Sequence, residues 1–305
     1  MRIVIIGGKG MIGRAVSRLA VTRGHEVVLL TRQTASQPDP NAKIETKHWD
    51  GKDAAVLAEH LKGSKGVINL AGENIGKSRW TPERKDLLLR SRLEPAAALV
   101  DALRLCQRPP MVLVQASAIG IYGTGDDAKN EDSAVGEDFL AMFAERWEKS
   151  TDASEISGIR RVVIRTGIVL QKGAGVLPQL MLPFQLMVGG PVGSGNQVYS
   201  WIHILDEAAA ILFLLENERC KGVYNLTAPN PCSNAEMGKV LARVMHRPYW
   251  MPVPGFALKL VLGEMSTLVL DGQRVLPRRL EADGYTFQFP KLEDALQALL
   301  AKQNR

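Results

Sequence analysis

Near its amino terminus the chain alternates a short apolar run with a stretch of helical periodicity. Arg2 to Ile6 is dense in β-branched apolar side chains, which predicts a buried strand. From Met11 to Val21 the apolar residues recur every three or four positions, so we expect a helix with one buried face. The turn Arg23-Gly24-His25 then introduces a second predicted strand, Glu26 to Leu30. Together these segments form one strand-helix-strand unit.

The same alternation continues along the chain and predicts an α/β fold. Further strands are expected at residues 43–47, 66–70, 111–115, 160–165, 198–204 and 222–226. Further helices are expected at residues 53–61, 82–106, 138–150, 177–188, 206–216 and 234–245. Ser233 and Glu236 have the spacing of a capping box at the start of the last helix. We expect Pro95 to kink its helix or split it in two, Pro183 to interrupt another, and residues 124–136 to form an acidic, mobile loop.

Four glycines, Gly7, Gly8, Gly10 and Gly13, lie between the first strand and the first helix. A strand that turns through glycines into a helix directs unpaired helix N–H groups and the positive end of the helix dipole at whatever lies above the turn. Glycine is needed there because a Cβ would block close approach of the backbone. This turn predicts a binding site for the pyrophosphate of a dinucleotide.

The end of the second strand indicates which dinucleotide is bound. About 20 residues past such glycines, folds that prefer NAD place an acid on the ribose, whereas folds that prefer NADP have a nearby arginine for the extra phosphate. Here Thr31 and Arg32 follow the strand, and no acid occurs between Glu26 and Asp39. The sequence therefore favours NADP as the cofactor.

These elements predict a Rossmann doubly wound parallel sheet with a smaller C-terminal α/β lobe on the substrate side. We expect residues 1–172, completed by about 202–228, to form the NADP-binding domain. Residues 173–201 and 229–305 are expected to form the C-terminal lobe. In such a sheet ligands lie outside the carboxyl ends of the strands, so the loop that begins at Leu70 should border the same crevice as the glycine turn.

Composition narrows the class of partner. The 305 residues are 46% apolar, which is enough for a sizeable core. The net charge of +6 comes from basic residues scattered among 32 acids, with no basic block, so we expect a small-molecule substrate and no nucleic acid. The three cysteines have neither CxxC nor metal spacing, which indicates reduced thiols and no metal site.

The location of the protein is also constrained. The first strand starts directly after Met1, so we expect no export signal. The longest apolar run, Ala208 to Leu215, is far shorter than the roughly 20 residues that cross a bilayer. We therefore expect a cytoplasmic protein that is not embedded in a membrane.

Several short motifs, in this order, resemble the extended short-chain dehydrogenase/reductases, the superfamily of sugar-nucleotide epimerases and dehydratases. They are the glycine turn, Asn69-Leu70-Ala71-Gly72, Ser117 to Gly123 and Arg165 to Leu170. More closely, the chain resembles the atypical epimerase-like branch, which is sometimes labelled cell-division-inhibitor-like. The segments that carry this likeness are Ala71 to Ile75 with Arg79-Trp80, Ser91 to Glu94, Gly193 to Gly195, and Ser200 to Ile204. In addition, the run Gly272 to Pro277 is similar to part of the branch's C-terminal domain of unknown function.

The resemblance implies a set of cofactor-binding residues. They are Gly7, Lys9, Gly10, Met11, Ile12, Gly13, Thr31, Arg32, Leu70, Ala71, Gly72, Arg92 and Val169. Val169 is implied to lie near the nicotinamide. Arg92, on the long third helix, has the chemistry to donate a charge-assisted fork to a phosphate, although an arginine on a helix is usually a solvated cation.

The catalytic pair of the superfamily is absent. Its reaction uses a tyrosine as general acid or base and a lysine four residues later. None of the five tyrosines here has lysine at that position, and the helix where the motif normally lies carries the apolar run Phe139 to Ala144. The nearest candidate proton donors are Ser117 and Tyr122. A tyrosine without a nearby lysine should keep a pKa of about 10, which favours proton donation and hence reduction.

Two interpretations therefore remain. In the first, the protein is an NADP(H)-dependent oxidoreductase or epimerase-like enzyme that acts on a sugar nucleotide or another carbonyl compound through Ser117 and Tyr122, with Glu73, Lys77 and His203 as weaker candidates. In the second, it is a catalytically silent sensor of NADP or NADPH that signals through a partner. The retained cofactor loops fit both, and we favour the enzyme. Neither interpretation defines the oligomeric state.

Overall fold

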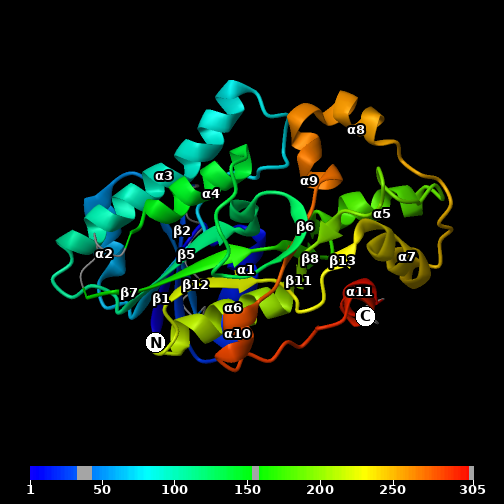
Figure 1. Ribbon diagram of the computed structural model, residues 1–305. Coiled ribbons are helices and arrows are strands. Elements are labelled where there is room, and N and C mark those ends of the chain that lie inside the picture. The colour runs from blue at the N-terminus through cyan, green and yellow to red at the C-terminus, as the bar shows by residue number, and fades with distance from the viewer. Residues whose placement is uncertain (33–42, 153–157, 302–305) are drawn as a thin grey trace.

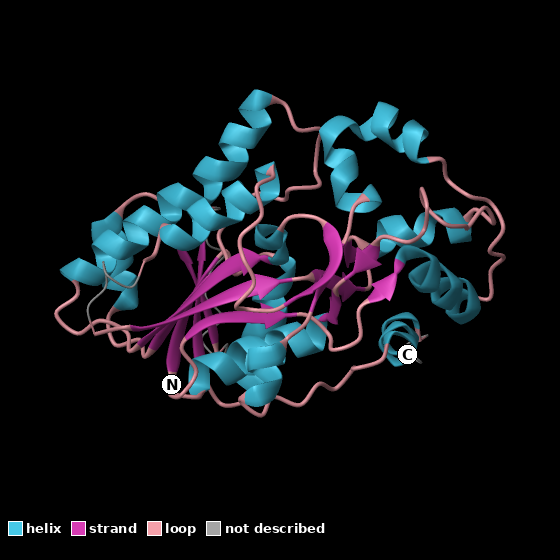
Figure 2. Cartoon of the chain, viewed as in Figure 1, coloured by secondary structure: helices cyan, strands magenta, loops and turns pink. Residues whose placement is uncertain are grey.

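A single parallel sheet organises the molecule. The computed structural model describes residues 1–32, 43–152 and 158–301. Within these ranges the central sheet has seven strands, all parallel, with helices on both faces (Figure 1, Figure 2). In order across the sheet, the strands are β12 (Gly222–Leu226), β7 (Arg160–Thr166), β5 (Val112–Ala118), β4 (Gly66–Asn69), β1 (Arg2–Ile6), β2 (Glu26–Thr31) and β3 (Ile44–His48). The strand order reverses between β1 and β4, and in such sheets ligands bind beside this point.

The helices form two layers and a separate group at one end of the sheet. They are α1 (Met11–Thr22), α2 (Ala54–Leu61), α3 (Pro82–Leu105), α4 (Phe139–Lys149), α5 (Leu177–Gln185), α6 (Ile204–Glu216), α7 (Asn234–Met245), α8 (Gly255–Leu262), α9 (Thr267–Leu270), α10 (Arg278–Ala282) and α11 (Leu292–Leu300). Helices α2, α3 and α4 cover one face of the sheet and α1, α6 and α10 the other (Figure 1). Among the side chains that cap these helices, Asp53, Thr81 and Asp138 each accept a hydrogen bond from an N–H group in the first turn of α2, α3 and α4.

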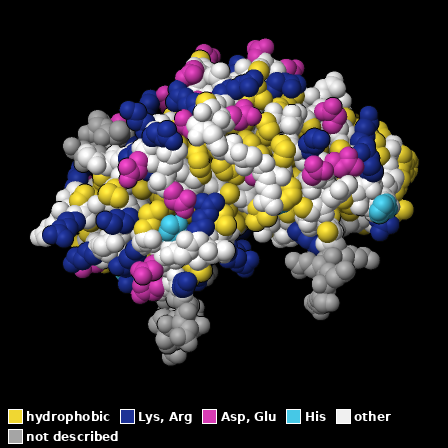
Figure 3. Space-filling view, turned by 90° about the horizontal axis from the view of Figure 1, so that it is seen from below, with side chains coloured by type: hydrophobic (Ala, Val, Ile, Leu, Met, Phe, Trp, Pro, Cys, Tyr) yellow, Lys and Arg dark blue, Asp and Glu magenta, His cyan; other side chains and the backbone are white. Residues whose placement is uncertain are grey.

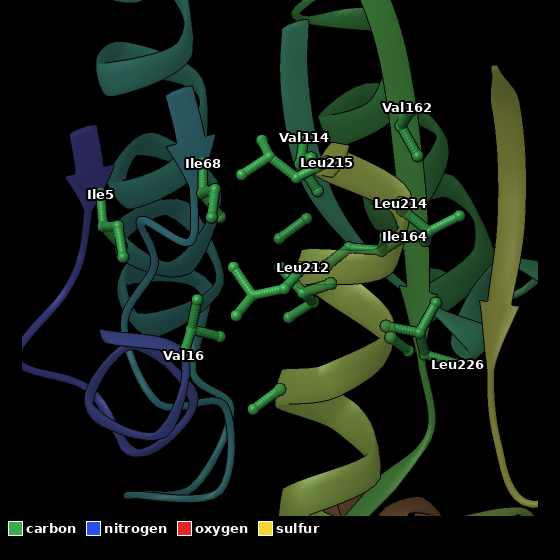
Figure 4. Packing of buried hydrophobic residues seen from close by; sticks show 14 of the residues in the cluster. Ile5, Val16, Ile68, Val114, Val162, Ile164, Leu212, Leu214, Leu215 and Leu226 are labelled. Atoms are coloured by element: carbon green, nitrogen blue, oxygen red, sulfur yellow. The ribbon is translucent and has the colours of Figure 1, made fainter. Parts of the chain in front are cut away.

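The core lies between the sheet and its two helix layers. Ile5, Ile68 and Val114, on neighbouring strands, are completely buried. They belong to one cluster with Val16 of α1 and Leu212 of α6 (Figure 4). Because a parallel sheet is buried on both faces, inner strands such as β1 and β2 are nearly continuous apolar runs, and this is why they were recognisable in the sequence.

The C-terminal lobe and the segments that join it to the sheet domain consist of short strands and helices. Strand β11 (Trp201–His203) pairs with β8 (Ile168–Gln171), and β8 also pairs with β9 (Ala174–Gly175). Two further pairs are β10 (Val198–Tyr199) with β13 (Cys232–Ser233), and β6 (Gly125–Lys129) with β14 (Gln273–Val275). The lobe has its own core, which includes Trp201, Leu241 and Leu296. Helices α5, α7 and α11 lie around it (Figure 1).

The predicted α/β class with a doubly wound sheet is confirmed, and the strands and helices of the sheet lie within a few residues of their predicted bounds. The capping box of Ser233 and Glu236 is also present. Pro95 lies inside α3, which continues as one 24-residue helix, so the predicted split does not occur. Pro183 likewise lies inside α5.

Two other predictions of secondary structure were wrong. Residues 124–136 are not entirely loop, because β6 forms there by pairing with β14. The strand predicted at 198–204 is divided at Ser200, and β10 and β11 belong to different small sheets. The Ser200 hydroxyl donates to the Gln273 carbonyl oxygen and accepts from the N–H of Val275, both at 2.8 Å. Through these two hydrogen bonds, Ser200, which separates β10 from β11, is attached to β14.

The surface shows no single basic block on the face that Figure 3 presents, where Lys and Arg groups lie at several separate places with Asp and Glu between them. Among the helices of the described ranges, none combines the length and apolarity needed to cross a bilayer. In the same ranges, no three His, Cys, Asp or Glu side chains are grouped so as to hold a metal ion.

Candidate functional site

The glycine turn joins β1 to α1 at the reversal point of the sheet. The N–H of Gly10 donates to the carbonyl oxygen of Gly7 at 3.0 Å, which closes the turn. Gly7 has a φ of 76°, and a Cβ there would lie 2.6 Å from the carbonyl oxygen of Leu70. A Cβ at Gly13 would lie 2.6 Å from Cα of Gly8. Glycine is therefore required for the strand, the helix and the loop after β4 to approach this closely.

The amino terminus of α1 is open above this turn. Gly10 is the N-cap residue, with neither a side-chain cap on the helix nor an acid in its first turn. Among the described residues, a Cβ at Gly10 would approach only the Gly7 carbonyl oxygen, at 3.2 Å. The first N–H groups of a helix need acceptors from outside it, and the helix dipole favours an anion there. The residues present thus fit the pyrophosphate of a dinucleotide.

Two predicted cofactor residues from distant parts of the sequence meet beside the turn. Met11 begins α1, and Val169 lies in β8. A Cβ on Gly175 of β9 would lie 3.1 Å from Sδ of Met11 and 3.4 Å from the carbonyl oxygen of Val169. Of the other predicted residues of the turn, Lys9 is exposed and Ile12 packs against the core of the sheet.

The loop after β4 is fixed by side chains beneath it. Leu70 donates its N–H to the carbonyl oxygen of Ile6 at 2.9 Å. The N–H of Ala71 donates to Oδ1 of Asn69 at 3.2 Å, and Nδ2 of Asn69 donates to Oε1 of Gln115 at 2.9 Å. Asn69 and Gln115 are both fully buried. The loop is therefore tied both to β1 and to β5.

Arg92 supports the same loop from below. It is 8% exposed, and its guanidinium lies over the rings of Phe143 and Trp147, at 4.9 and 4.7 Å from their centroids. It donates to the carbonyl oxygens of Leu88 and Glu73 at 3.0 and 3.1 Å. A Cβ on Gly72 would lie 2.8 Å from Cζ of Arg92, so the glycine makes room for the guanidinium. Burial lowers the pKa of Arg92 to about 10, and the side chain still carries its charge at neutral pH.

Arg32 lies at the carboxyl end of β2, directly after the half-buried Thr31. Its side chain is 70% exposed, and Nη2 donates to Oε1 of Glu73 at 3.0 Å. The structure thus brings the predicted cofactor arginine to the loop after β4, at the carboxyl ends of the strands. Glu73 was expected only as a weak candidate for proton transfer, and here it is the ion-pair partner of Arg32.

Ser117 and Tyr122, the predicted catalytic residues, belong to one buried network. Oγ of Ser117 donates to Oε1 of Glu148 at 2.7 Å. Arg165 donates to both oxygens of Glu148, at 2.8 and 2.9 Å, and to the hydroxyl of Tyr122 at 2.8 Å. The Tyr122 hydroxyl in turn donates to Oδ1 of Asn225 at 2.7 Å. Both predicted hydroxyls are therefore directed at protein partners.

Burial changes the acidity of this network. Ser117 and Tyr122 are 3% and 4% exposed. Burial raises the pKa of Tyr122, and the nearby Arg165 only partly offsets this effect. The expectation that Tyr122 keeps its ordinary pKa was therefore wrong. The pKa is shifted upward, which keeps the phenol protonated. The sequence analysis also missed Glu148, Arg165 and Asn225 as partners, although Arg165 gave a signal as a charged residue within an apolar strand.

A second buried acid lies at the end of β7. Oγ1 of Thr166 donates to Oε1 of Glu207 at 2.8 Å, and Oε2 of Glu207 has no hydrogen-bond partner among the residues that the structure describes. Glu207 is fully buried, and burial raises its pKa to about 8, so this carboxyl is mostly protonated at neutral pH. The sequence analysis missed it, because an acid in the first turn of a helix is usually a solvated one.

His203 has a structural setting. It is 2% exposed, its Nδ1 accepts the N–H of Leu205 at 3.1 Å, and its ring centroid lies 3.9 Å from that of Phe289. Burial lowers the pKa of His203 to about 4, so the ring is neutral at physiological pH. Lys77, the other weak candidate, is exposed in the loop after β4.

The helix that carries the tyrosine and lysine pair in the superfamily is occupied by aromatic packing here. Phe139 of α4 lies against Trp80, with ring centroids 5.3 Å apart, and against Phe143 at 5.9 Å. These rings line the side of α4 that meets the loop after β4 and Arg92. The rings of Phe139 and Phe143 themselves carry no group that transfers a proton.

Comparison with known proteins agrees with this architecture. The NAD dependent epimerase/dehydratase family matches residues 3–141, and a domain of unknown function, DUF1731, matches residues 253–299. The chain is 40% identical over 304 residues to the epimerase family protein YfhF of Bacillus subtilis, covering 99% of this chain and 98% of that protein.

Two solved structures are similar over nearly the whole chain. The human epimerase family protein SDR39U1 (isoform 2), crystallised with NADPH, superimposes with a TM-score of 0.88 at 34% identity, covering 98% of this chain and 99% of that one. The nucleoside-diphosphate sugar epimerase of Corynebacterium glutamicum gives a TM-score of 0.77 at 30% identity, covering 98% of this chain and 58% of that one.

The fold and its glycine turn define a Rossmann-type protein of the NAD(P)-dependent epimerase/dehydratase superfamily. Within that superfamily, the chain belongs to the epimerase family that contains YfhF and SDR39U1, with an epimerase/dehydratase domain followed by DUF1731. The predicted resemblance to the epimerase-like branch, including the domain of unknown function, is confirmed.

Proposed function

We propose that this protein is an NADP(H)-dependent oxidoreductase or epimerase-like enzyme. The observation that carries the proposal is the position of Arg32, at the end of β2 and beside the crevice, in a chain whose glycine turn leaves the amino terminus of α1 open. The human relative crystallised with NADPH supports the same choice of cofactor. The substrate would be a sugar nucleotide or another carbonyl compound, in keeping with the superfamily.

The described residues divide into groups with different tasks in this proposal. The N–H groups at the start of α1 bind the pyrophosphate, and Arg32 binds the 2′-phosphate. Met11 and Val169 would border the nicotinamide, and the bound cofactor would supply the chemistry of hydride transfer. Residues 1–172 with about 202–228 form the cofactor domain, and 173–201 with 229–305 the substrate side.

Ser117 and Tyr122 are the proposed proton donors. The phenol is protonated at neutral pH because burial raises its pKa. To donate a proton to a substrate oxygen, Tyr122 must give up its hydrogen bond to Asn225, while Arg165 remains as donor to the phenol oxygen and stabilises the phenolate. The reducing direction is therefore the favoured one.

Titration of the chain with NADPH and NADH tests the cofactor assignment. A charged contact to the 2′-phosphate contributes roughly 1.5–3 kcal/mol, or about ten- to a hundredfold in affinity. NADPH should therefore bind more tightly than NADH, and Arg32→Ala should remove most of the difference. Equal affinities in the unmodified chain would contradict the assignment.

A second function, a catalytically silent sensor of NADP(H), is favoured by one observation. The hydroxyls of Ser117 and Tyr122 are already engaged by Glu148 and Asn225 in a buried network. A change in NADPH absorbance on addition of carbonyl compounds or sugar nucleotides supports the enzyme. A partner whose affinity differs between the oxidised and reduced cofactor complexes, without turnover, supports the sensor.

A further inference from the structure

The carboxylate of Glu73 lies between two arginines beside the carboxyl end of β2. Its Oε1 is 3.0 Å from Nη2 of Arg32, and its Oε2 is 3.9 Å from Nη1 of Arg84. Glu73 is 24% exposed, whereas Arg32 is 70% exposed. Arg32 therefore presents to solvent a guanidinium that already has an anionic partner within the protein.

Glu73 is held in this place by α3. Its N–H donates to Oγ of Ser91 at 3.0 Å, and its carbonyl oxygen accepts from Arg92 at 3.1 Å. Arg92 is itself fixed by the aromatic rings of α4. The hydrogen bond from Arg32 lowers the pKa of Glu73, so the carboxylate is charged at neutral pH. It is thus a fixed negative charge and not a mobile surface acid.

We propose that Glu73 determines the strength of the cofactor preference, because its carboxylate competes with the 2′-phosphate of NADP(H) for Arg32. This inference rests on the proposed function, in which Arg32 binds that phosphate. A phosphate monoester carries a charge of about −1.5 to −2 at neutral pH, so it is repelled by a carboxylate that shares its guanidinium. The adenosine ribose of NAD(H) has a neutral hydroxyl at this position. Glu73 therefore weakens the binding of NADP(H) selectively.

Glu73→Gln tests the proposal, because the amide keeps the shape of the side chain and one oxygen acceptor for Arg32 while removing the charge. The variant should bind NADPH about three- to tenfold more tightly, with less than about a twofold change for NADH. Affinities are measured by fluorescence titration, without any substrate.

Glu216→Gln is the matched control. Glu216 pairs with Arg23 at 2.9 Å and has a similar exposure of 32%, but it is the last residue of α6 and lies near the amino end of β2, whereas Arg32 follows the carboxyl end of that strand. This variant should leave both affinities unchanged. A gain in NADPH affinity as large as that of Glu73→Gln would show that the effect is one of net charge alone.

A double-mutant cycle separates this inference from the proposed function. Glu73→Gln introduced into the Arg32→Ala chain should raise NADPH affinity less than it does in the unmodified chain, because the competition for the guanidinium is gone and only the direct charge repulsion remains. If the unmodified chain does not prefer NADPH, or if Arg32→Ala leaves the preference intact, the cofactor assignment fails and this inference fails with it. If the preference depends on Arg32 but Glu73→Gln lowers NADPH affinity or leaves it unchanged, only the role of Glu73 is overturned.

Discussion

The hydroxyl of Tyr122 accepts a hydrogen bond of 2.8 Å from Arg165 and donates one of 2.7 Å to Asn225. Tyr122 ends the short 3-10 helix η1 (Ile119–Tyr122), whereas Arg165 lies in β7 and Asn225 in β12. The phenol thereby connects the segment after β5 to two neighbouring strands of the sheet. The same Arg165 holds Glu148 of α4 through two hydrogen bonds, so one guanidinium organises the whole network.

Replacing Arg165 by Met should destabilise the protein strongly. The substitution leaves the Glu148 carboxylate, whose side chain is 13% exposed, without its cation in a buried site. Breaking a buried ion pair in this way costs about 3–5 kcal/mol. Urea unfolding of the unmodified and variant chains measures the difference.

Arg243→Met provides the comparison for that experiment. Arg243 pairs with Glu293 at 2.8 Å, but the two side chains are 63% and 38% exposed. An exposed pair contributes at most about 1 kcal/mol. If Arg165→Met and Arg243→Met lowered the free energy of unfolding by similar amounts, the Glu148 carboxylate would not be effectively shielded from solvent.

Glu207 should make the stability of the protein depend on pH. Its folded pKa of about 8 lies well above its ordinary value of 4.5. Between these two values the unfolded chain binds fewer protons than the folded chain, so the free energy of unfolding falls as the pH rises. Glu207→Gln is neutral at every pH and should gain up to a few kcal/mol over the unmodified chain between about pH 5.5 and pH 8.

Unfolding in urea at both ends of that pH range measures this gain. Glu236→Gln is the control, since hydrogen bonds from Ser233 lower the pKa of Glu236 below 4.5 and the carboxylate stays charged throughout the range. Its effect on the free energy of unfolding should be the same at pH 5.5 and pH 8. A gain for Glu207→Gln that is likewise independent of pH would contradict a raised pKa for Glu207.

Those parts of the fold that depend on residues close together in the chain could be predicted from the sequence. The strand Arg2–Ile6, the glycine turn and α1 follow one another directly, so their apolar periodicity and glycine spacing carry the whole signal. Strand β6 has the polar sequence Gly-Asp-Asp-Ala-Lys and forms only because β14, at the other end of the chain, supplies its hydrogen bonds. No local pattern contains that information.

The same limit applies within the site. Arg32 was recognisable because its distance from the glycine turn is fixed by one helix and one strand. Its pairing with Glu73, and the pairing of Arg165 with Glu148, depend on how α3 and α4 pack on the sheet. Periodicity defines which face of a helix is buried, but it does not specify which polar side chain meets which.

Gly10→Val should abolish tight binding of the cofactor while the chain remains folded. The branched side chain would fill the space above the amino terminus of α1, where a Cβ already approaches the Gly7 carbonyl oxygen at 3.2 Å. Losing even one charge-assisted hydrogen bond to the pyrophosphate costs about 1.5–3 kcal/mol, so NADPH affinity should fall at least about tenfold. Circular dichroism and thermal unfolding verify the fold. A folded variant with normal NADPH affinity would place the cofactor elsewhere.

Tyr122→Phe and Ser117→Ala should separate the catalytic role of these hydroxyls from their structural role. Tyr122→Phe leaves Arg165 and Asn225 each without one partner, which costs about 1–3 kcal/mol of stability whether or not the protein is an enzyme. If Tyr122 is the proton donor, turnover of a carbonyl substrate should also fall about 10²–10⁴-fold while NADPH affinity stays unchanged.

Tyr224→Phe provides the matched comparison. Tyr224 is also buried, and its hydroxyl donates at 2.6 Å to Asp283, which takes no part in the hydrogen bonds of the Ser117 network. It should therefore destabilise the chain to a similar extent without changing turnover. Equal losses of turnover in Tyr122→Phe and Tyr224→Phe would mean that the Tyr122 hydroxyl acts through stability alone, and full activity in the Ser117 and Tyr122 double variant would exclude both hydroxyls as the proton donor.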